Sequence, residues 1–164
     1  MSLSVEVSLN APNATGRIEI GAAPETVYEL VSDPGKLADV AEEYAGHRWV
    51  NGSDGPAVGA KFRGRNRRGF RRWSTLSTIT DAEPGRRFGF EVTSVAGLPV
   101  SRWQYDFEAT DGGCVVVESM WERRPSWFKV PTSTVTGVWN RDEANAANIA
   151  ATLARLKRAA EASR

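Results

Sequence analysis

The chain has 164 residues, of which 21 are basic and 20 are acidic, so its formal net charge is +1. This length predicts one domain, residues 1–164, which can bury about 70% of the surface that the unfolded chain exposes. The near balance of charge argues against a dedicated nucleic-acid-binding protein, because such a protein is basic overall or sharply divided in charge.

Histidine and cysteine are too scarce for most metal sites. His47 is the only histidine and Cys114 the only cysteine, so an intrachain disulfide is excluded and a zinc site is not expected. We expect no metal and no cofactor. Residues 1–16 lack the basic start and the apolar stretch of a signal peptide, and no segment is as long and apolar as a membrane span. The expectation is a cytoplasmic protein without stable membrane insertion.

The first part of the chain predicts a strand followed by two short helices. Residues 16–20 alternate apolar and polar side chains, and residues 3–9 alternate as well, as an extra edge strand or as the start of the same one. Pro24 suits the first turn of a helix that ends at Asp33-Pro34. Residues 36–46 repeat the helical spacing and predict the second helix.

Between residues 47 and 123 the apolar spacing changes to two, which predicts about five antiparallel strands with short turns and one apolar face. Two prolines interrupt this pattern in residues 123–135. Residues 137–162 then form the longest amphipathic segment, a helix that would cover the apolar face of the sheet. The predicted fold class is α+β.

Five segments carry a family resemblance over about residues 14–162. They are IEIGAAPETVYELVSDP, VGAKFRGRNRRGFRRW, TDAEPGRRFGFEV, RWQYDFEATDGGCVVVES and NIAATLARLKRAAE. In this order they resemble the START/Bet v 1-like helix-grip superfamily (SRPBCC), and more narrowly its bacterial polyketide cyclase/dehydrase and lipid-transport group. The resemblance implies a curved antiparallel sheet of about seven strands around the C-terminal helix, with a cavity between them. It leaves the role of the N-terminal dozen residues open.

Six tryptophans suit either a core or the wall of a ligand cavity. For a cavity, we predict ligand contacts from the inner face of the sheet and from the C-terminal helix. The strand residues are Phe62, Trp73, Thr75, Phe90, Trp103, Tyr105, Ser119 and Trp121, and the helix residues are Trp139, Asp142 and Ile149. The alternative is a solid core whose hydroxyl groups bond to the backbone. The strand orientations stay open, because several strands carry bulky residues on both faces.

The arginine-rich stretch 64–73, GRNRRGFRRW, reads as a hairpin with a tight turn at residues 66–69. Because side chains alternate along a strand, we expect Trp73 to point to the inner face of the sheet and Arg72 to point to solvent. Arg71 shares the parity of Trp73 and could face an acidic ligand group at the cavity rim. Without a recognisable module for reading bases, the stretch does not indicate a nucleic-acid partner.

No catalytic residue can be assigned from the sequence. The acid–base candidates are Tyr44, His47, Arg102, Tyr105 and Asp142, and Ser119 and Thr75 lack a histidine base at motif spacing. The leading hypothesis is therefore the binding or carrying of a small hydrophobic molecule, whether lipid-like, polyketide or aromatic. The alternative is an aromatase/cyclase-type enzyme acting on a polyketide-like substrate. A monomer and a homodimer both remain open.

Overall fold

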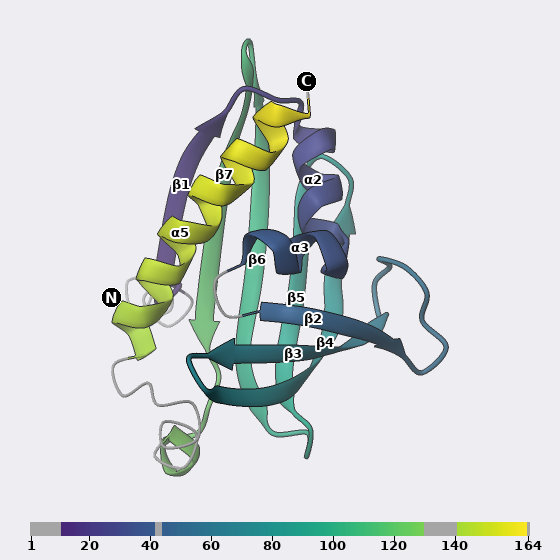
Figure 1. The fold of residues 1–164 in the computed structure, drawn as a ribbon, viewed down its shortest axis with the longest axis vertical. Coiled ribbons are helices and arrows are strands. Elements are labelled where there is room, and N and C mark those ends of the chain that lie inside the picture. Colours follow the sequence, from purple (N-terminus) through teal and green to yellow (C-terminus); the bar gives the residue numbers. More distant parts are fainter. Residues whose placement is uncertain (1–10, 42–43, 130–140, 164) are drawn as a thin grey trace, which may run out of the picture.

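The computed structural model describes residues 11–41, 44–129 and 141–163. Within them, seven antiparallel strands form one curved sheet in the order β1-β7-β6-β5-β4-β3-β2. The strands are β1 (Ala14–Ile20), β2 (Tyr44–Val50), β3 (Lys61–Arg68), β4 (Arg71–Glu83), β5 (Arg87–Ser94), β6 (Pro99–Thr110) and β7 (Gly113–Glu122). The sheet curls strongly, so that β2 and β3 run crosswise in front of β5 and β6 in Figure 1.

Two short helices connect β1 to β2, and each begins at a proline. They are α2 (Pro24–Ser32) and α3 (Pro34–Val40). Asp33 ends α2 and caps α3, because its side chain accepts hydrogen bonds from the backbone N–H groups of Gly35 and Lys36 at 2.8 and 3.2 Å. The Asp33-Pro34 pair therefore separates the two helices as predicted.

The long helix α5 (Arg141–Ala162) lies obliquely across the concave side of the sheet, in front of β1 and β7 (Figure 1). Its buried residues Ile149, Leu153 and Leu156 belong to the main core. Gly16 on β1 permits this close approach, because a Cβ atom there would lie 2.6 Å from Cγ2 of Ile149. The predicted α+β helix-grip fold with its curved antiparallel sheet and long C-terminal helix is confirmed.

The predicted second helix is too long. The structure ends α3 at Val40, and Tyr44 begins β2, which gives six strands after the helices instead of about five. The ring of Tyr44 packs on that of Phe62 with centroids 6.3 Å apart, so pairing with β3 overrides the helical spacing of the segment. The possible strand at residues 3–9 and the predicted helix start at residue 137 lie outside the described residues.

The β3–β4 hairpin turns two residues later than predicted. Arg67 and Arg68 remain in the ladder, opposite Arg72 and Arg71, and the turn is made by Gly69 and Phe70. Gly69 has a φ of +58°, which a glycine adopts without steric cost, and a two-residue hairpin requires such a residue. The arginines of this hairpin follow the strands and are not confined to its tip.

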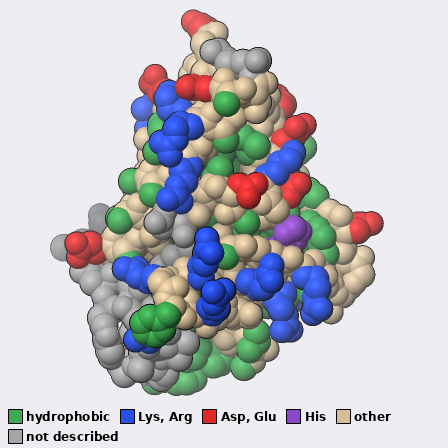
Figure 2. Space-filling model, in the orientation of Figure 1, with side chains coloured by type: hydrophobic (Ala, Val, Ile, Leu, Met, Phe, Trp, Pro, Cys, Tyr) green, Lys and Arg blue, Asp and Glu red, His purple; other side chains and the backbone are tan. Residues whose placement is uncertain are grey.

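Basic side chains gather on the face of the molecule that carries β2 and β3, beside the histidine (Figure 2). Arg48 and Arg63 are exposed and stand opposite each other in the β2–β3 ladder.

In the part of the chain that the structure describes, no helix is long and apolar enough to cross a membrane.

Candidate functional site

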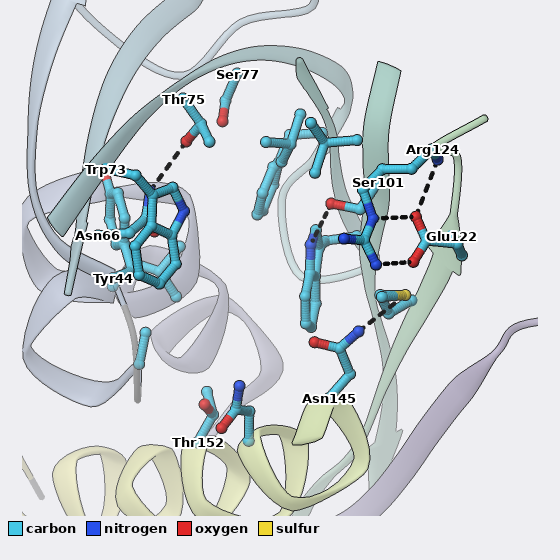
Figure 3. Close-up of a pocket in the computed structure, with 18 of the residues that line it drawn as sticks. Tyr44, Asn66, Trp73, Thr75, Ser77, Ser101, Glu122, Arg124, Asn145 and Thr152 are labelled. Carbon is cyan, nitrogen blue, oxygen red and sulfur yellow. Dashed lines mark hydrogen bonds and ion pairs between the residues drawn. The ribbon is translucent and has the colours of Figure 1, made fainter. Parts of the chain in front are cut away.

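A cavity of about 380 Å³ lies between the concave side of the sheet and the helices α3 and α5. Strands β2 to β7 all contribute to its wall, and α5 closes it with Asn145, Asn148 and Thr152. Figure 3 shows these side chains converging on one space from the sheet and from the helix. Side chains alternate between the two faces of a strand, so the side chains on the concave face of the sheet surround the cavity.

Five of the predicted site residues lie on the cavity wall. They are Trp73, Thr75, Phe90, Trp103 and Tyr105. Three of them have their polar groups occupied. Trp103 Nε1 donates to Ser101 Oγ at 3.0 Å, Thr75 Oγ1 accepts from Asn66 Nδ2 at 3.2 Å, and the Tyr105 hydroxyl donates to Glu118 at 2.8 Å. Aromatic rings and hydrogen-bonded polar side chains thus share the wall, as Figure 3 shows for Trp73 and for Thr75.

Two predicted residues on β7 face the other side of the sheet, so the assumed orientation of this strand is wrong. Glu118, Met120 and Glu122 line the cavity, which sends Ser119 and Trp121 outward. The hydroxyl of Ser119 lies 3.3 Å from that of Thr15 on β1. The guanidinium of Arg102 lies over the ring of Trp121, 5.8 Å from the ring centroid.

Phe62 and Arg71 are also absent from the cavity wall. Phe62 is buried behind the wall, where its ring contacts those of Tyr44, Trp49 and Phe90. Arg71 lies at the hairpin turn, with its guanidinium 5.2 Å from the centroid of the exposed Phe70 ring. It therefore stacks at the end of the hairpin and does not face the interior of the cavity.

The C-terminal helix presents a different face from the one predicted. Asn145, Asn148 and Thr152 point to the cavity, whereas Ile149 packs against Gly16 of β1 and Asp142 is exposed. Ile149 was predicted as an apolar wall residue, but it packs on β1, and the helix turns polar residues to the cavity. Trp139 lies outside the described residues.

The other acid–base candidates separate into wall and surface residues. Tyr44 lines the cavity, and Gly64 makes room for its ring, since a Cβ atom there would lie 2.8 Å from Cε2 of Tyr44. Burial and the nearby Asp33 carboxylate raise the pKa of Tyr44. His47 packs edge-on against Trp49 outside the cavity wall, and Arg102 forms an ion pair of 3.0 Å with Asp81.

A buried tyrosine–carboxyl pair stands in the cavity wall. The hydroxyl of Tyr105 donates a hydrogen bond of 2.8 Å to Oε1 of Glu118, its direct partner in the β6–β7 ladder. Glu118 is only 2% exposed and Tyr105 only 3%. Burial raises the pKa of Glu118 to about 8, although the hydrogen bond from Tyr105 opposes the shift. At neutral pH Glu118 is therefore mainly an uncharged carboxylic acid.

A second acidic residue of the wall, Glu122, differs from Glu118 because it is paired with a positive charge. Arg124 Nε donates to Glu122 Oε1 at 2.9 Å, and Arg124 Nη2 donates to Oε2 at 2.8 Å. Burial alone would raise the pKa of Glu122, but these bonds and the charge of Arg124 hold it below its ordinary value. One cavity thus contains a neutral carboxyl on β7 and, four residues later, an ionised one.

Three buried polar atoms lack a hydrogen-bond partner in residues 11–41, 44–129 and 141–163. They are the hydroxyl of Tyr44, Oε2 of Glu118 and Oδ1 of Asn145, and all three residues line this cavity. In Figure 3 the amide oxygen of Asn145 points toward the hollow, away from the amide nitrogen's contact with Met120. Buried polar groups are normally paired, so their concentration here marks a place built for polar contacts.

Glu118 and Asn145 are two of several wall residues that the sequence reasoning missed. The turn at residues 111–112 carries the signal for Glu118, because pairing Thr110 with Gly113 places Tyr105 opposite Glu118. No comparable signal marks Asn145, whose burial depends on how α5 is rotated. Among the described residues no group of histidine, cysteine, aspartate and glutamate side chains could hold a metal ion.

Comparisons with known proteins agree with the fold. Residues 11–161 match the family described as polyketide cyclase/dehydrase and lipid transport. The Polyketide_cyc-like protein Cgl2372 from Corynebacterium glutamicum is 30% identical, and the match covers 91% of both chains with a TM-score of 0.60. No curated protein matches the chain.

Two larger solved structures share the fold at lower identity. The di-domain ARO/CYC BexL from the BE-7585A biosynthetic pathway is 20% identical, and the match covers 96% of this chain and 53% of BexL with a TM-score of 0.66. The di-domain ARO/CYC StfQ from the steffimycin pathway is 15% identical, and the match covers 91% of this chain and 50% of StfQ with a TM-score of 0.68. The match over residues 11–161 places the chain in the polyketide cyclase/dehydrase and lipid-transport family.

Proposed function

We propose that this protein binds a small hydrophobic, ring-containing molecule in the cavity between the sheet and α5. The size of the cavity, about 380 Å³, is that of a small-molecule site. Trp73, Phe90 and Trp103 offer flat apolar surfaces on which rings can pack. Membership of a family that includes lipid transport agrees with this function.

The observation that carries the proposal is the concentration of unpartnered polar atoms on one apolar wall. Leaving a buried hydroxyl, amide or carboxyl without a hydrogen bond costs about 1–3 kcal/mol each. Among the described residues such atoms occur at Tyr44, Glu118 and Asn145, all on the cavity wall. A bound molecule with a few oxygen atoms would pair with them and would bury its rings against the tryptophans.

A cyclase-type enzyme is the second candidate, and Tyr105 with Glu118 favours it. An uncharged carboxyl that accepts a hydrogen bond from a tyrosine can donate its own proton toward a carbonyl oxygen. Such a pair would favour enol forms of a polyketide chain. The ARO/CYC neighbours BexL and StfQ share the fold at 20% and 15% identity and lend this candidate support at the level of fold.

Native mass spectrometry of protein purified from its own host tests the binding function. We expect a co-purifying small molecule that Asn148→Phe, which fills the cavity, no longer retains. Ala147→Phe is the matched control, because Ala147 is exposed on the same helix and does not line the cavity. Retention by both variants would contradict the proposed site.

The recovered compound then separates carrying from catalysis. A carrier returns the compound unchanged after incubation with fresh protein. A cyclase converts a linear polyketide-like compound into a ring with loss of water, and Glu118→Leu would stop that conversion. Ligand-free protein that also binds none of the aromatic probes named below would refute both functions.

A further inference from the structure

We propose that Glu118 acts as a neutral hydrogen-bond donor to a carbonyl oxygen of the ligand, so that the cavity selects ketones and related neutral carbonyl compounds over carboxylate anions. This inference rests on the proposed binding function and specifies the class of ligand. Three observations carry it. They are the hydrogen bonds of Glu118, the side chains that line the cavity around it, and the ion pair of Arg124 with Glu122.

The hydrogen bonds of Glu118 leave one oxygen atom for a ligand. Oε1 accepts from the Tyr105 hydroxyl at 2.8 Å, whereas Oε2 is buried without a partner and the residue lines the cavity. The carboxyl group is thereby oriented, with one oxygen paired to Tyr105 and the other without a partner among the described residues. A protonated carboxyl of this kind has a single O–H group to donate, and a carbonyl oxygen is its complementary acceptor.

Burial keeps Glu118 protonated near pH 7. From β6 it faces Tyr105, and from β2 the cavity wall includes Tyr44; neither supplies a positive charge. The wall residues of α3, α5, β3, β4 and β5 include no titratable side chain. Burial therefore dominates and raises the pKa of Glu118 to about 8.

The cation on the cavity wall is already neutralised. Arg124 binds Glu122 through Nε and Nη2 at 2.9 and 2.8 Å, and both side chains are largely buried. An anionic ligand placed at Glu118 would lose its hydration without gaining a positive partner, which is costly in an apolar site. A ketone oxygen loses little hydration and gains the hydrogen bond.

Asn145 provides a second polar contact, which comes from α5. Its Oδ1 is buried and unpartnered, and its Nδ2 has only the weak acceptor Met120 Sδ at 3.8 Å. A free amide oxygen accepts a hydroxyl hydrogen. The two residues together suit a ring compound with a carbonyl group and a hydroxyl group.

Three naphthalene derivatives of almost the same shape test the inference. They are 2-acetylnaphthalene, 2-ethylnaphthalene and 2-naphthoate, and their binding at pH 7 is followed by quenching of tryptophan fluorescence. The wild-type protein should bind the ketone about three- to tenfold more tightly than the hydrocarbon, which corresponds to one added hydrogen bond. The carboxylate should bind more weakly than either.

Substitutions at Glu118 separate donation from packing. Glu118→Gln keeps an N–H donor and should retain the preference for the ketone, whereas Glu118→Leu should bind ketone and hydrocarbon equally. In the wild-type protein the preference should decline as the pH rises through 8, because Glu118 loses its proton, and in Glu118→Gln it should not decline. The infrared carbonyl band of bound 2-acetylnaphthalene should also shift to lower frequency in wild type but not in Glu118→Leu.

The outcomes distinguish the two levels of the proposal. If the hydrocarbon binds but the ketone shows no advantage, or if 2-naphthoate binds as tightly as the ketone, the role of Glu118 is refuted while the binding function stands. If none of the three compounds binds the wild-type protein and the protein from its own host carries no small molecule, the binding function fails and the inference fails with it. The pH series and the infrared band on wild-type protein decide the matter even if Glu118→Leu does not fold.

Discussion

The hydroxyl of Tyr105 and the carboxyl of Glu118 form a 2.8 Å hydrogen bond across the β6–β7 ladder, inside the wall of the cavity. This pair links the fold to its proposed chemistry. The strand register brings the two side chains together, burial raises the pKa of the carboxyl, and its other oxygen has no hydrogen-bond partner among the described residues.

Removing the tyrosine hydroxyl should destabilise the protein. Tyr105→Phe leaves both oxygens of Glu118 without a partner, so we expect the free energy of unfolding to fall by about 1–3 kcal/mol in urea titrations. Tyr28→Phe is the control, because Tyr28 is buried by ring contacts with Phe88 and Phe107 and none of the described residues forms a hydrogen bond with its hydroxyl. Equal effects of the two substitutions would contradict the role of the Tyr105 hydrogen bond.

The raised pKa of Glu118 predicts a stability that declines with rising pH. In the unfolded chain this carboxyl ionises near 4.5, and in the folded protein near 8. The folded state therefore binds more protons between these values. The contribution of Glu118 is complete below pH 4.5 and is lost as the pH rises to 8, at no more than about 1.4 kcal/mol per pH unit.

Glu118→Gln removes this titration and isolates its effect. The difference in unfolding free energy between wild type and Glu118→Gln should change between pH 5 and pH 8 in favour of the variant, and should level off above pH 8. Urea titrations across this range measure it. A constant difference across the range would show that Glu118 titrates normally and would contradict its assignment as a neutral carboxyl.

Close packing of α5 on β1 predicts a specific interaction between Gly16 and Ile149. Gly16→Ala places a methyl group 2.6 Å from Ile149 Cγ2, so we expect a loss of about 1–3 kcal/mol in the free energy of unfolding. Ile149→Ala creates space at the same point. The double variant should therefore be more stable than the sum of the two single effects predicts, and strict additivity would contradict the contact.

The facing arginines of β2 and β3 predict a stabilising charge reversal. Arg48 and Arg63 are exposed cross-strand partners of like charge, an arrangement that weakens a sheet. Arg63→Glu should raise the free energy of unfolding by about 0.2–1 kcal/mol at low salt and by less at 1 M salt. Arg86→Glu is the control. It should lower the free energy of unfolding, because it replaces the ion pair of Arg86 with Glu83 by two like charges.

The order of elements and several of their boundaries follow from local patterns, which explains why the fold could be predicted. Pro24, Asp33-Pro34 and the turn at residues 111–112 mark boundaries by backbone chemistry that needs no tertiary context. Tyr44 is the exception, because only its packing on Phe62 and Gly64 decides between helix and strand.

The site was harder to predict, because it depends on which face of each element turns inward. On β7 the aromatic Trp121 looked like the inner residue, yet the strand turns Glu118 and Met120 to the cavity and stacks Trp121 with Arg102 on the other face. On α5 the apolar Ile149 is used for packing on β1, and Asn145 reaches the cavity. A hydrophobic pattern predicts which face of a helix or strand packs in the core. It does not predict which face lines a cavity of mixed polarity.

The indole N–H signals of the tryptophans offer the most direct test of binding in the cavity. Trp73 and Trp103 line it, whereas Trp127 is 66% exposed and does not. Two-dimensional ¹⁵N NMR during a titration with 2-acetylnaphthalene, with signals assigned by single Trp→Phe substitutions, should shift the signals of Trp73 and Trp103 and leave that of Trp127 in place. Saturable shifts confined to Trp127, or no shifts at all, would contradict a ligand site between the sheet and α5.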